Sequence, residues 1–263
     1  MKIPKIIFLS LTVFGFYTFS VVNVSAAEID DEISMDYAIE QASPDDIDLS
    51  SENGTIYTDE YLNELVESYA RVKAVVDSNC KTRSGICWMD RTLNVNTYQQ
   101  ENGYYCGPAN IKQVVQYING SSASQATYAS RMGTNSSVGT LVYKMRDELN
   151  YRQSYNHYVY QQMNSGSYDT FMTIVQGNIF YGNDTEVKGK PVILHAKTAS
   201  LYQYNGTNLG HYLTVNGYDM IGGKITYVDP WNANYGRGTT LGQHIDSAIN
   251  VFNTVSGSRY VIY

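Results

Sequence analysis

Residues 100–110 read QENGYYCGPAN, a glycine-containing loop that leads directly into an amphipathic helix. Apolar residues follow at the i, i+3, i+4 and i+7 spacing of a helix with one buried face, namely Ile111, Val114, Val115 and Ile118. Asn119-Gly120 is typical of the end of such a helix. Cys106 is therefore expected at the helix start, with Pro108 in an early position where its missing N–H costs nothing. Because unpaired backbone N–H groups at a helix start favour a thiolate over a thiol, Cys106 has the position of a nucleophile.

The first 27 residues have the features of a secretory signal peptide. Lys2 and Lys5 precede an apolar run at residues 6–22, and small residues suited to a cleavage site follow at 25–27. A retained membrane anchor is the alternative. No second stretch of about 20 apolar residues follows, so no membrane span is expected after signal cleavage. The protein is predicted to be secreted, either extracellular or associated with the cell wall.

The charge of the chain argues against nucleic acid as a partner. The formal net charge is -7, and removing residues 1–27 takes away two lysines and no acid, which moves it to -9. Tyrosine is abundant at 25 residues. Tyrosine-rich surfaces can contact sugars or peptides, but amphipathic packing is the favoured interpretation.

Three cysteines are present: Cys80, Cys87 and Cys106. In an oxidising compartment an odd number leaves one thiol over, and Cys80 with Cys87 would close a short loop and leave Cys106 free. The alternative is that Cys106 is bridged. No second cysteine pair or nearby histidine accompanies Cys80 and Cys87, so neither a metal site nor a cofactor is expected.

The chain is predicted to have four parts. After the signal peptide, residues 28–57 form an acidic leader that is expected to be disordered, because acids accumulate there without lysine or arginine. Residues 58–88 carry an amphipathic helix and the two-cysteine loop. This part either packs as ordinary structure or is a pro-segment that covers the active site until it is removed. Residues 89–263 form the catalytic domain.

The hydrophobic pattern changes within the catalytic domain. After the Cys106 helix, further helices are predicted at residues 124–132, 140–149 and about 167–181. The apolar period then becomes two, which predicts strands at 191–196, 211–218, 224–231 and 259–263, and a short helix at 245–251. Helices first and strands afterwards indicate an α+β fold.

A predicted hairpin joins two polar residues that suit acid–base chemistry. With its turn at Gly222-Gly223, His211 begins one strand and Asp229 ends the next, so the two are expected to be neighbours within hydrogen-bonding reach. A carboxylate holds an imidazole in one tautomer and leaves its other nitrogen to face a nucleophile. Cys106 is the candidate nucleophile.

Gln100 is the candidate oxyanion stabiliser. It lies six residues before Cys106, where its side-chain amide can lie beside the Cys106 backbone N–H. Each donor of this kind contributes on the order of 10²- to 10³-fold to a rate. The neighbouring residue Gln99 is the alternative candidate for this role. His195 would replace His211 as the base if the strands paired differently.

These residues carry a family resemblance. Gln100, Cys106-Gly107, His211 and Asp229, in this order, resemble the papain-like cysteine peptidases. The segments YCGPA, HYLTVNGYD and VDPW are similar to bacterial peptidase family 39-like domains of the cysteine class, over residues 89–263. The resemblance implies an N-terminal helical half that carries the cysteine and a C-terminal antiparallel sheet that carries the histidine and aspartate. It also implies that Trp231 shields the Asp229–His211 bond.

The resemblance does not extend to a substrate. Bacterial relatives process leader peptides inside secretory ABC transporters at double-glycine sites, but this sequence has no transporter segment, and Tyr105 stands where those enzymes usually carry Asp. The predicted function is a secreted cysteine peptidase acting on a peptide or protein substrate through a thioester on Cys106. The alternatives are an amidase or transpeptidase that uses the same site on cell-wall peptides, and a non-catalytic binding module that keeps the fold.

Overall fold

The computed structural model describes residues 58–82, 90–153, 157–180, 189–235, 241–257 and 259–263. The predicted signal peptide and acidic leader lie outside these residues, as do the side chains of Cys80 and Cys87 and therefore their predicted pairing.

Helices dominate the first part of the described chain. They are α2 (Asp59–Thr82), α3 (Cys106–Asn119), α4 (Gln125–Met132), α5 (Val142–Arg152) and α6 (Tyr168–Phe180). Their ends follow local sequence signals: the Ser124 side chain caps α4 by accepting from the Thr127 backbone N–H, and Gly120 ends α3 in the left-handed conformation (φ 75°).

The second part of the chain supplies most of an antiparallel sheet of seven strands. The strands are β1 (Asp90–Thr92), β2 (Tyr160–Met163), β3 (Val192–Lys197), β4 (Gly210–Asp219), β5 (Lys224–Asp229), β6 (Gly242–Ser247) and β7 (Arg259–Ile262). Their order is β2-β7-β3-β4-β5-β6, and β1 pairs with β4. The α+β class and the division into a helical half and a sheet half are thus confirmed.

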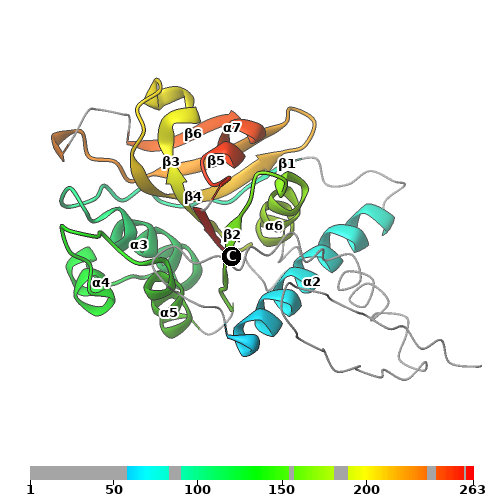
Figure 1. Ribbon diagram of the computed structural model, residues 1–263, viewed down its shortest axis with the longest axis horizontal. Coiled ribbons are helices and arrows are strands. Elements are labelled where there is room, and N and C mark those ends of the chain that lie inside the picture. Colours follow the sequence, from blue (N-terminus) through cyan, green and yellow to red (C-terminus); the bar gives the residue numbers. More distant parts are fainter. Residues whose placement is uncertain (1–57, 83–89, 154–156, 181–188, 236–240, 258) are drawn as a thin grey trace, which may run out of the picture.

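Figure 1 shows how the two halves meet: α3, α4 and α5 lie together on one side, and the strands β3 to β6 lie above them with α7 (Ala248–Asn253). Helix α2 packs on α6, where Gly177 leaves room for the side chain and backbone of Val72. The hydroxyl of Tyr61 on α2 also donates to the carbonyl oxygen of Tyr160 on β2 (2.8 Å).

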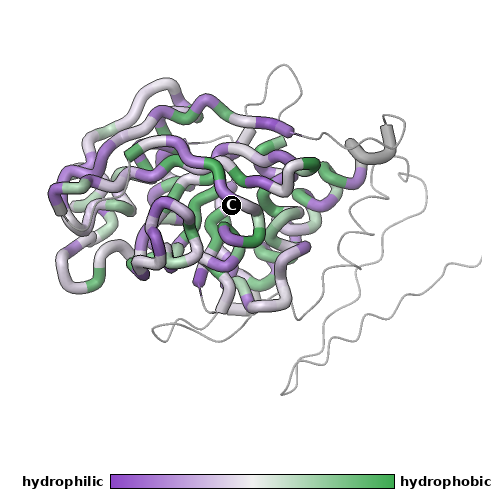
Figure 2. Tube along the Cα trace, turned by 90° about the horizontal axis from the view of Figure 1, so that it is seen from above, coloured by the Kyte–Doolittle hydropathy of each residue, from purple (hydrophilic) through white to green (hydrophobic). Residues whose placement is uncertain are grey.

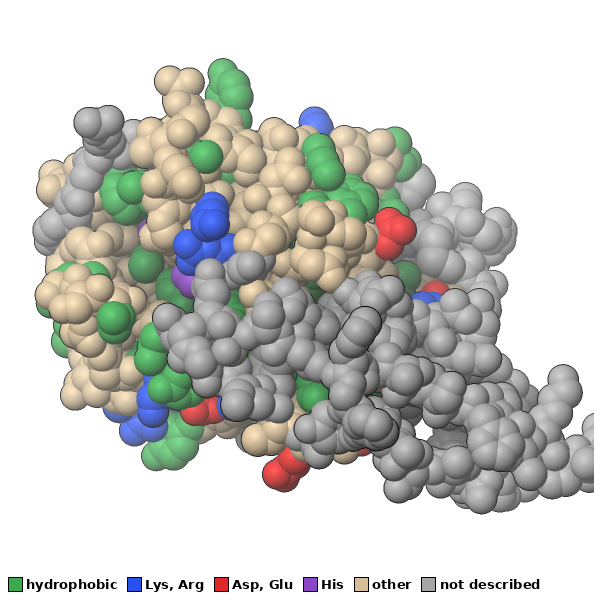
Figure 3. All heavy atoms as spheres, in the orientation of Figure 1, with side chains coloured by type: hydrophobic (Ala, Val, Ile, Leu, Met, Phe, Trp, Pro, Cys, Tyr) green, Lys and Arg blue, Asp and Glu red, His purple; other side chains and the backbone are tan. Residues whose placement is uncertain are grey.

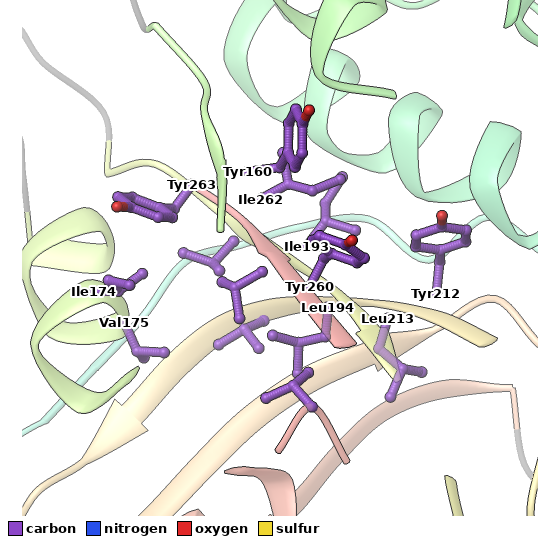
Figure 4. Close-up of a cluster of buried hydrophobic side chains, with 14 of the residues drawn as sticks. Tyr160, Ile174, Val175, Ile193, Leu194, Tyr212, Leu213, Tyr260, Ile262 and Tyr263 are labelled. Carbon is purple, nitrogen blue, oxygen red and sulfur yellow. The ribbon is translucent and has the colours of Figure 1, made fainter. Parts of the chain in front are cut away.

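The core lies between the sheet and the helices. Hydrophobic stretches run through the interior of the chain trace, with hydrophilic ones toward the outside (Figure 2). The centre of the core is filled by aliphatic side chains from β3, β4, β7 and α6, among them Ile193, Leu194, Leu213, Ile262, Ile174 and Val175 (Figure 4). This burial stabilises the strands that carry the polar residues described below.

One predicted element is displaced. The helix expected at residues 245–251 begins only at Ala248, because residues 245–247 belong to β6 and pair with β5. The Ser247 side chain then caps α7 by accepting from the Asn250 backbone N–H. The N-cap residue Ser247 therefore predicts the start of α7 better than the spacing of apolar residues does.

Within the described ranges, no helix is both long enough and apolar enough to cross a membrane.

Candidate active site

Cys106 is the first residue of α3 and is half-buried. The residue before it, Tyr105, makes no side-chain cap, so backbone N–H groups of the first turn have no partner within the helix. Gly107 is required by packing, since a Cβ atom there would lie 2.4 Å from Oγ1 of Thr140. The close approach of the segment at Thr140 fixes the helix start that presents the thiol.

His211 and Asp229 form a buried pair at the sheet end of the site. Nε2 of His211 lies 2.9 Å from Oδ1 of Asp229, and both side chains are almost fully buried. A bulge at residues 215–217 shifts the strand register by one residue, and Thr214 pairs with Val228. Continued by one residue, this register places Asp229 opposite Leu213, on the face of the sheet that also carries His211. The two are therefore diagonal neighbours on one face of the sheet, a spacing that long side chains can bridge.

The second nitrogen of His211 is directed at the thiol. Because Nε2 bonds to Asp229, the hydrogen bond between His211 and Cys106 uses Nδ1. Burial raises the pKa of Cys106, but the hydrogen bond and charge of His211, with hydrogen bonds from the backbone of Tyr212 and Gly107, outweigh it, and the pKa lies below its ordinary value. Burial lowers the pKa of His211, whereas Asp229 and Cys106 raise it to about 10. A thiolate–imidazolium pair is the arrangement these shifts favour near neutral pH.

Asp229 is held by two partners besides His211. The hydroxyl of Tyr204 donates to Oδ2 (2.7 Å), and the backbone N–H of Trp231 donates to Oδ1 (2.8 Å). The Trp231 ring also packs edge-on against the His211 ring, with centroids 5.3 Å apart. The sequence did not reveal Tyr204, because a single tyrosine in a three-residue helix (Tyr202–Tyr204) shows no periodicity.

The two candidate glutamines differ in burial. Gln100 is buried, with its backbone N–H donating to the carbonyl oxygen of Pro230 (2.8 Å), whereas Gln99 is exposed. Nε2 of Gln100 donates to the carbonyl oxygen of Asn102 (2.9 Å), and Nδ2 of Asn232 donates to the carbonyl oxygen of Gln100 (3.1 Å). Gln100 is thus fastened to the segment that follows Asp229, and it is the better-placed candidate.

Asn110 joins the two halves of the site. From the first turn and a half of α3, its Nδ2 donates to the carbonyl oxygens of Cys106 and Tyr212, each at 2.8 Å, and its Oδ1 accepts from the Thr214 hydroxyl. It links the cysteine helix to the strand that carries His211. The sequence offered one signal for this role: Asn110 stands on the apolar face of the helix, where a buried amide requires partners.

The other histidines are placed differently. His195 pairs with Arg259, whose Nη1 lies 2.8 Å from His195 Nε2. His157 is exposed and contacts Glu64, and His244 lies on β6 beside the Tyr227 ring. Of the four histidines, His211 is the one whose side chain bonds to Cys106.

Comparisons with known proteins bear on this site. The family model described as the Peptidase_C39 like family matches residues 92–243, which include Gln100, Cys106, His211 and Asp229. No curated protein matches the chain.

Solved structures that are similar to the chain include the following three. The peptidase domain of Streptococcus ComA, a bi-functional ABC transporter involved in a quorum sensing pathway, has 20% identity and a TM-score of 0.43, covering 65% of this chain and 97% of that one. Xylellain, a cysteine protease from Xylella fastidiosa, has 14% identity and a TM-score of 0.42, with coverages of 66% and 85%. The bromelain protease of Ananas comosus, in complex with the E64 inhibitor, has 12% identity and a TM-score of 0.41, with coverages of 66% and 97%. Similarities this low add no weight to the family match.

Proposed function

Because the chain belongs to the peptidase C39-like family and is a cysteine-type peptidase, we propose that it is secreted and hydrolyses peptide bonds through a thioester on Cys106. The observation that carries the proposal is the hydrogen-bonded series Cys106–His211–Asp229, which joins a helix start to a buried carboxylate. Residues 1–27 support export, and N-terminal sequencing of protein recovered from culture medium tests that part.

The acylation step follows from this geometry. The Cys106 thiolate attacks the scissile carbonyl carbon, an S–C bond forms, and the π electrons move to the carbonyl oxygen. As the tetrahedral intermediate collapses, the C–N bond breaks and Nδ1 of His211 gives its proton to the departing amine. The product is a thioester on Cys106 and a released amine.

The deacylation step runs the same series in reverse. Nδ1 of the now neutral His211 accepts a proton from water as the water oxygen attacks the thioester carbonyl, and the S–C bond then breaks to restore the thiolate. Asp229 stays ionised throughout, because its role is to orient His211 and to stabilise the imidazolium.

Two donors support the developing oxyanion in this proposal. They are the backbone N–H of Cys106, at the first position of α3, and the side-chain amide of Gln100. One amide hydrogen of Gln100 is engaged by Asn102, and the other remains for the substrate oxygen. The hydrogen bond from the Gln100 backbone N–H to the Pro230 carbonyl oxygen supports this position of the Gln100 side chain.

A defined peptide pool tests the function. Wild-type protein is incubated with the pool, and products are identified by mass spectrometry with and without an added amine acceptor, which separates hydrolysis from transfer. We expect cleavage by wild type and none by Cys106→Ala or by protein alkylated at Cys106. Cleavage that survives both treatments would remove Cys106 from the mechanism and overturn the proposal.

A further inference from the structure

A second polar cluster lies on the sheet, outside the Cys106–His211–Asp229 series. It is built from Arg259 on β7 and His195 on β3, joined by the 2.8 Å contact between Arg259 Nη1 and His195 Nε2. A guanidinium only donates, so Nε2 of His195 accepts and its Nδ1 carries the proton. Burial lowers the pKa of His195, as do Arg259 and Lys197, to about 3, which agrees with a neutral ring.

This cluster contains two buried donors without acceptors. Nδ1 of His195 and Nε of Arg259 are both buried, and neither has a hydrogen-bond partner among the residues that the structure describes. Leaving such donors unpaired is costly, because each has given up its bond to water. The ligand group that pairs with these two donors must offer acceptor oxygens.

The charge of the cluster indicates the charge of its ligand. Arg259 keeps its positive charge at any relevant pH, and Lys197 lies two residues from His195 on the same strand. Across the described ranges, no ion pair neutralises Arg259 or Lys197. On the face drawn in Figure 3, Lys and Arg side chains gather beside a histidine. In a chain with a formal net charge of -7, an unneutralised cationic spot points to an anionic ligand.

Tyr212 connects this cluster to the nucleophile. Its backbone forms a hydrogen bond with Cys106, and its ring stacks on the His195 ring with centroids 4.8 Å apart. Its hydroxyl donates to the carbonyl oxygen of Thr140 (2.7 Å), so this face of the sheet looks toward the helical half. Figure 4 shows the Tyr212 and Tyr260 rings on the same side of the sheet and Leu213 on the other. Tyr212 is therefore the residue that contacts both sites: its backbone bonds to Cys106, and its ring stacks on His195.

A buried hydrogen-bond acceptor lies on the same face of the sheet as His195 and Tyr260. Gln162 on β2 pairs in register with Tyr260, which in turn stacks beside His195. Oε1 of Gln162 is buried with no partner among the described residues. The two donors and the cation suit a carboxylate, and the amide oxygen of Gln162 suits a donor such as a peptide N–H. A peptide that carries a carboxylate therefore fits this face better than a free anion does.

We propose that Arg259 and His195 form a subsite that binds a carboxylate of the peptide substrate. The inference rests on the proposed function, since the substrate is a peptide attacked by Cys106. The carboxylate is either an acidic side chain or the free C-terminus of the peptide. Both present two acceptor oxygens to Arg259 Nε and His195 Nδ1.

Chloroacetyl peptides test the subsite without requiring turnover. In each probe the Cys106 thiolate forms an S–C bond to the CH₂ group as the C–Cl bond breaks and chloride leaves. One series places Glu, or Gln in its place, at the first, second or third residue of a tripeptide amide. The other compares tri-alanine with a free acid and with an amide at its C-terminus. Mass spectrometry of the proteolytic peptide that carries Cys106 gives the rate of modification at this residue.

At one position of the carboxylate, we expect wild type to react about tenfold faster with the charged probe than with its neutral counterpart at low salt, the range expected for a hydrogen bond to a charged group. In Arg259→Gln this ratio falls to within twofold, and Arg259→Lys restores part of it. Arg71→Gln, on the exposed surface of α2, is the matched control and keeps the wild-type ratio. Iodoacetamide, which has no carboxylate, should modify Cys106 equally in all four proteins, which shows that the thiol is intact.

Equal rates for charged and neutral probes at every position in wild type would overturn the subsite. So would a preference that Arg259→Gln leaves unchanged. The result that overturns the proposed function is different: a protein that selects the charged probes through Arg259 but cleaves no peptide. The position of the preferred carboxylate separates an acidic side chain from a free C-terminus.

Discussion

His211 and His195 occupy neighbouring strands, one position apart in register, yet their pKa values are shifted in opposite directions. Ala196 pairs with His211 across β3 and β4, and His195 pairs with Tyr212. Burial lowers the pKa of both histidines, but Asp229 and Cys106 raise the pKa of His211 to about 10, while Arg259 and Lys197 lower that of His195 further, to about 3. The sign of the neighbouring charge, rather than burial, therefore separates an acid–base group from a neutral donor.

The difference in pKa indicates which histidine can act as the acid–base group. A histidine that keeps its proton to about pH 10 can stabilise a thiolate at neutral pH and protonate a leaving amine. A histidine with a pKa of about 3 cannot take up that proton at neutral pH. His195 as an alternative base is thus disfavoured by the structure, although the spacing of the strands alone left it open.

The largest effect is expected from removing His211. His211→Asn should lower kcat/KM for peptide cleavage by about 10³-fold, since within the described part of the chain His211 is the side chain that bonds to the thiol and can move the proton. The control is His157→Asn. His157 is exposed and contacts Glu64, so this variant should cleave peptides like wild type. A His211→Asn protein with activity near wild type would place the base elsewhere.

Asp229→Asn should have the next largest effect, a loss of about 10²- to 10³-fold in kcat/KM. The carboxylate is a cause of the raised pKa of His211, so without its charge that pKa falls below about 10 and the imidazolium loses its proton at lower pH. The alkaline limb of the pH–rate profile should therefore move to lower pH. If the limb stays in place while the rate falls, Asp229 acts through structure alone.

Tyr204→Phe should have a smaller effect, because it removes one of three hydrogen bonds to Asp229 and leaves the carboxylate charged. We expect a loss of about 3- to 10-fold in kcat/KM and of about 1–2 kcal/mol in the free energy of unfolding. Tyr202→Phe is the matched control, since Tyr202 lies in the same short helix but is 88% exposed. Equal behaviour of the two variants in denaturant melts and rate assays would contradict a positioning role for Tyr204.

The smallest effect concerns the charge state of His195. In Arg259→Gln the pKa of His195 should rise above about 3, because the main positive neighbour is gone, but should stay below about 6.5, because burial and Lys197 still lower it. NMR titration of the imidazole measures this shift. A pKa that does not move would mean that Arg259 does not help to keep His195 neutral, and the comparison with His211 would lose its main electrostatic basis.

Much of the arrangement could be predicted from the sequence, because its signals are local. The spacing of Ile111 and its neighbours fixed a helix with Cys106 at its start, and α3 begins at that residue. The alternation around His211 and Asp229 predicted a hairpin, and β4 and β5 pair as one. The predicted α+β class is confirmed for the same reason: the change of hydrophobic period is strong.

The rest depends on tertiary contacts that leave no periodic trace. Strand β2 reads YQQM and is buried at all four positions, so it lacks the alternation that marks a half-buried strand. The bulge at residues 215–217 makes Asp229 a diagonal neighbour of His211, and the isolated Gly217 within it is the one local signal of a bulge in this strand. Tyr204, Asn110 and Arg259 act through partners that lie far away in sequence.

The most direct test of the account is the pH dependence of Cys106 alkylation by iodoacetamide, followed by mass spectrometry of the peptide that carries this cysteine. The account predicts a half-maximal rate below about pH 8.5 in wild type, because His211 lowers the pKa of the thiol. In His211→Asn the midpoint should move to higher pH, since burial then raises the pKa of Cys106 against the backbone hydrogen bonds of Tyr212 and Gly107 alone. A wild-type midpoint at about 8.5, or one that His211→Asn leaves unchanged, would contradict the proposal that these two residues form the reactive pair.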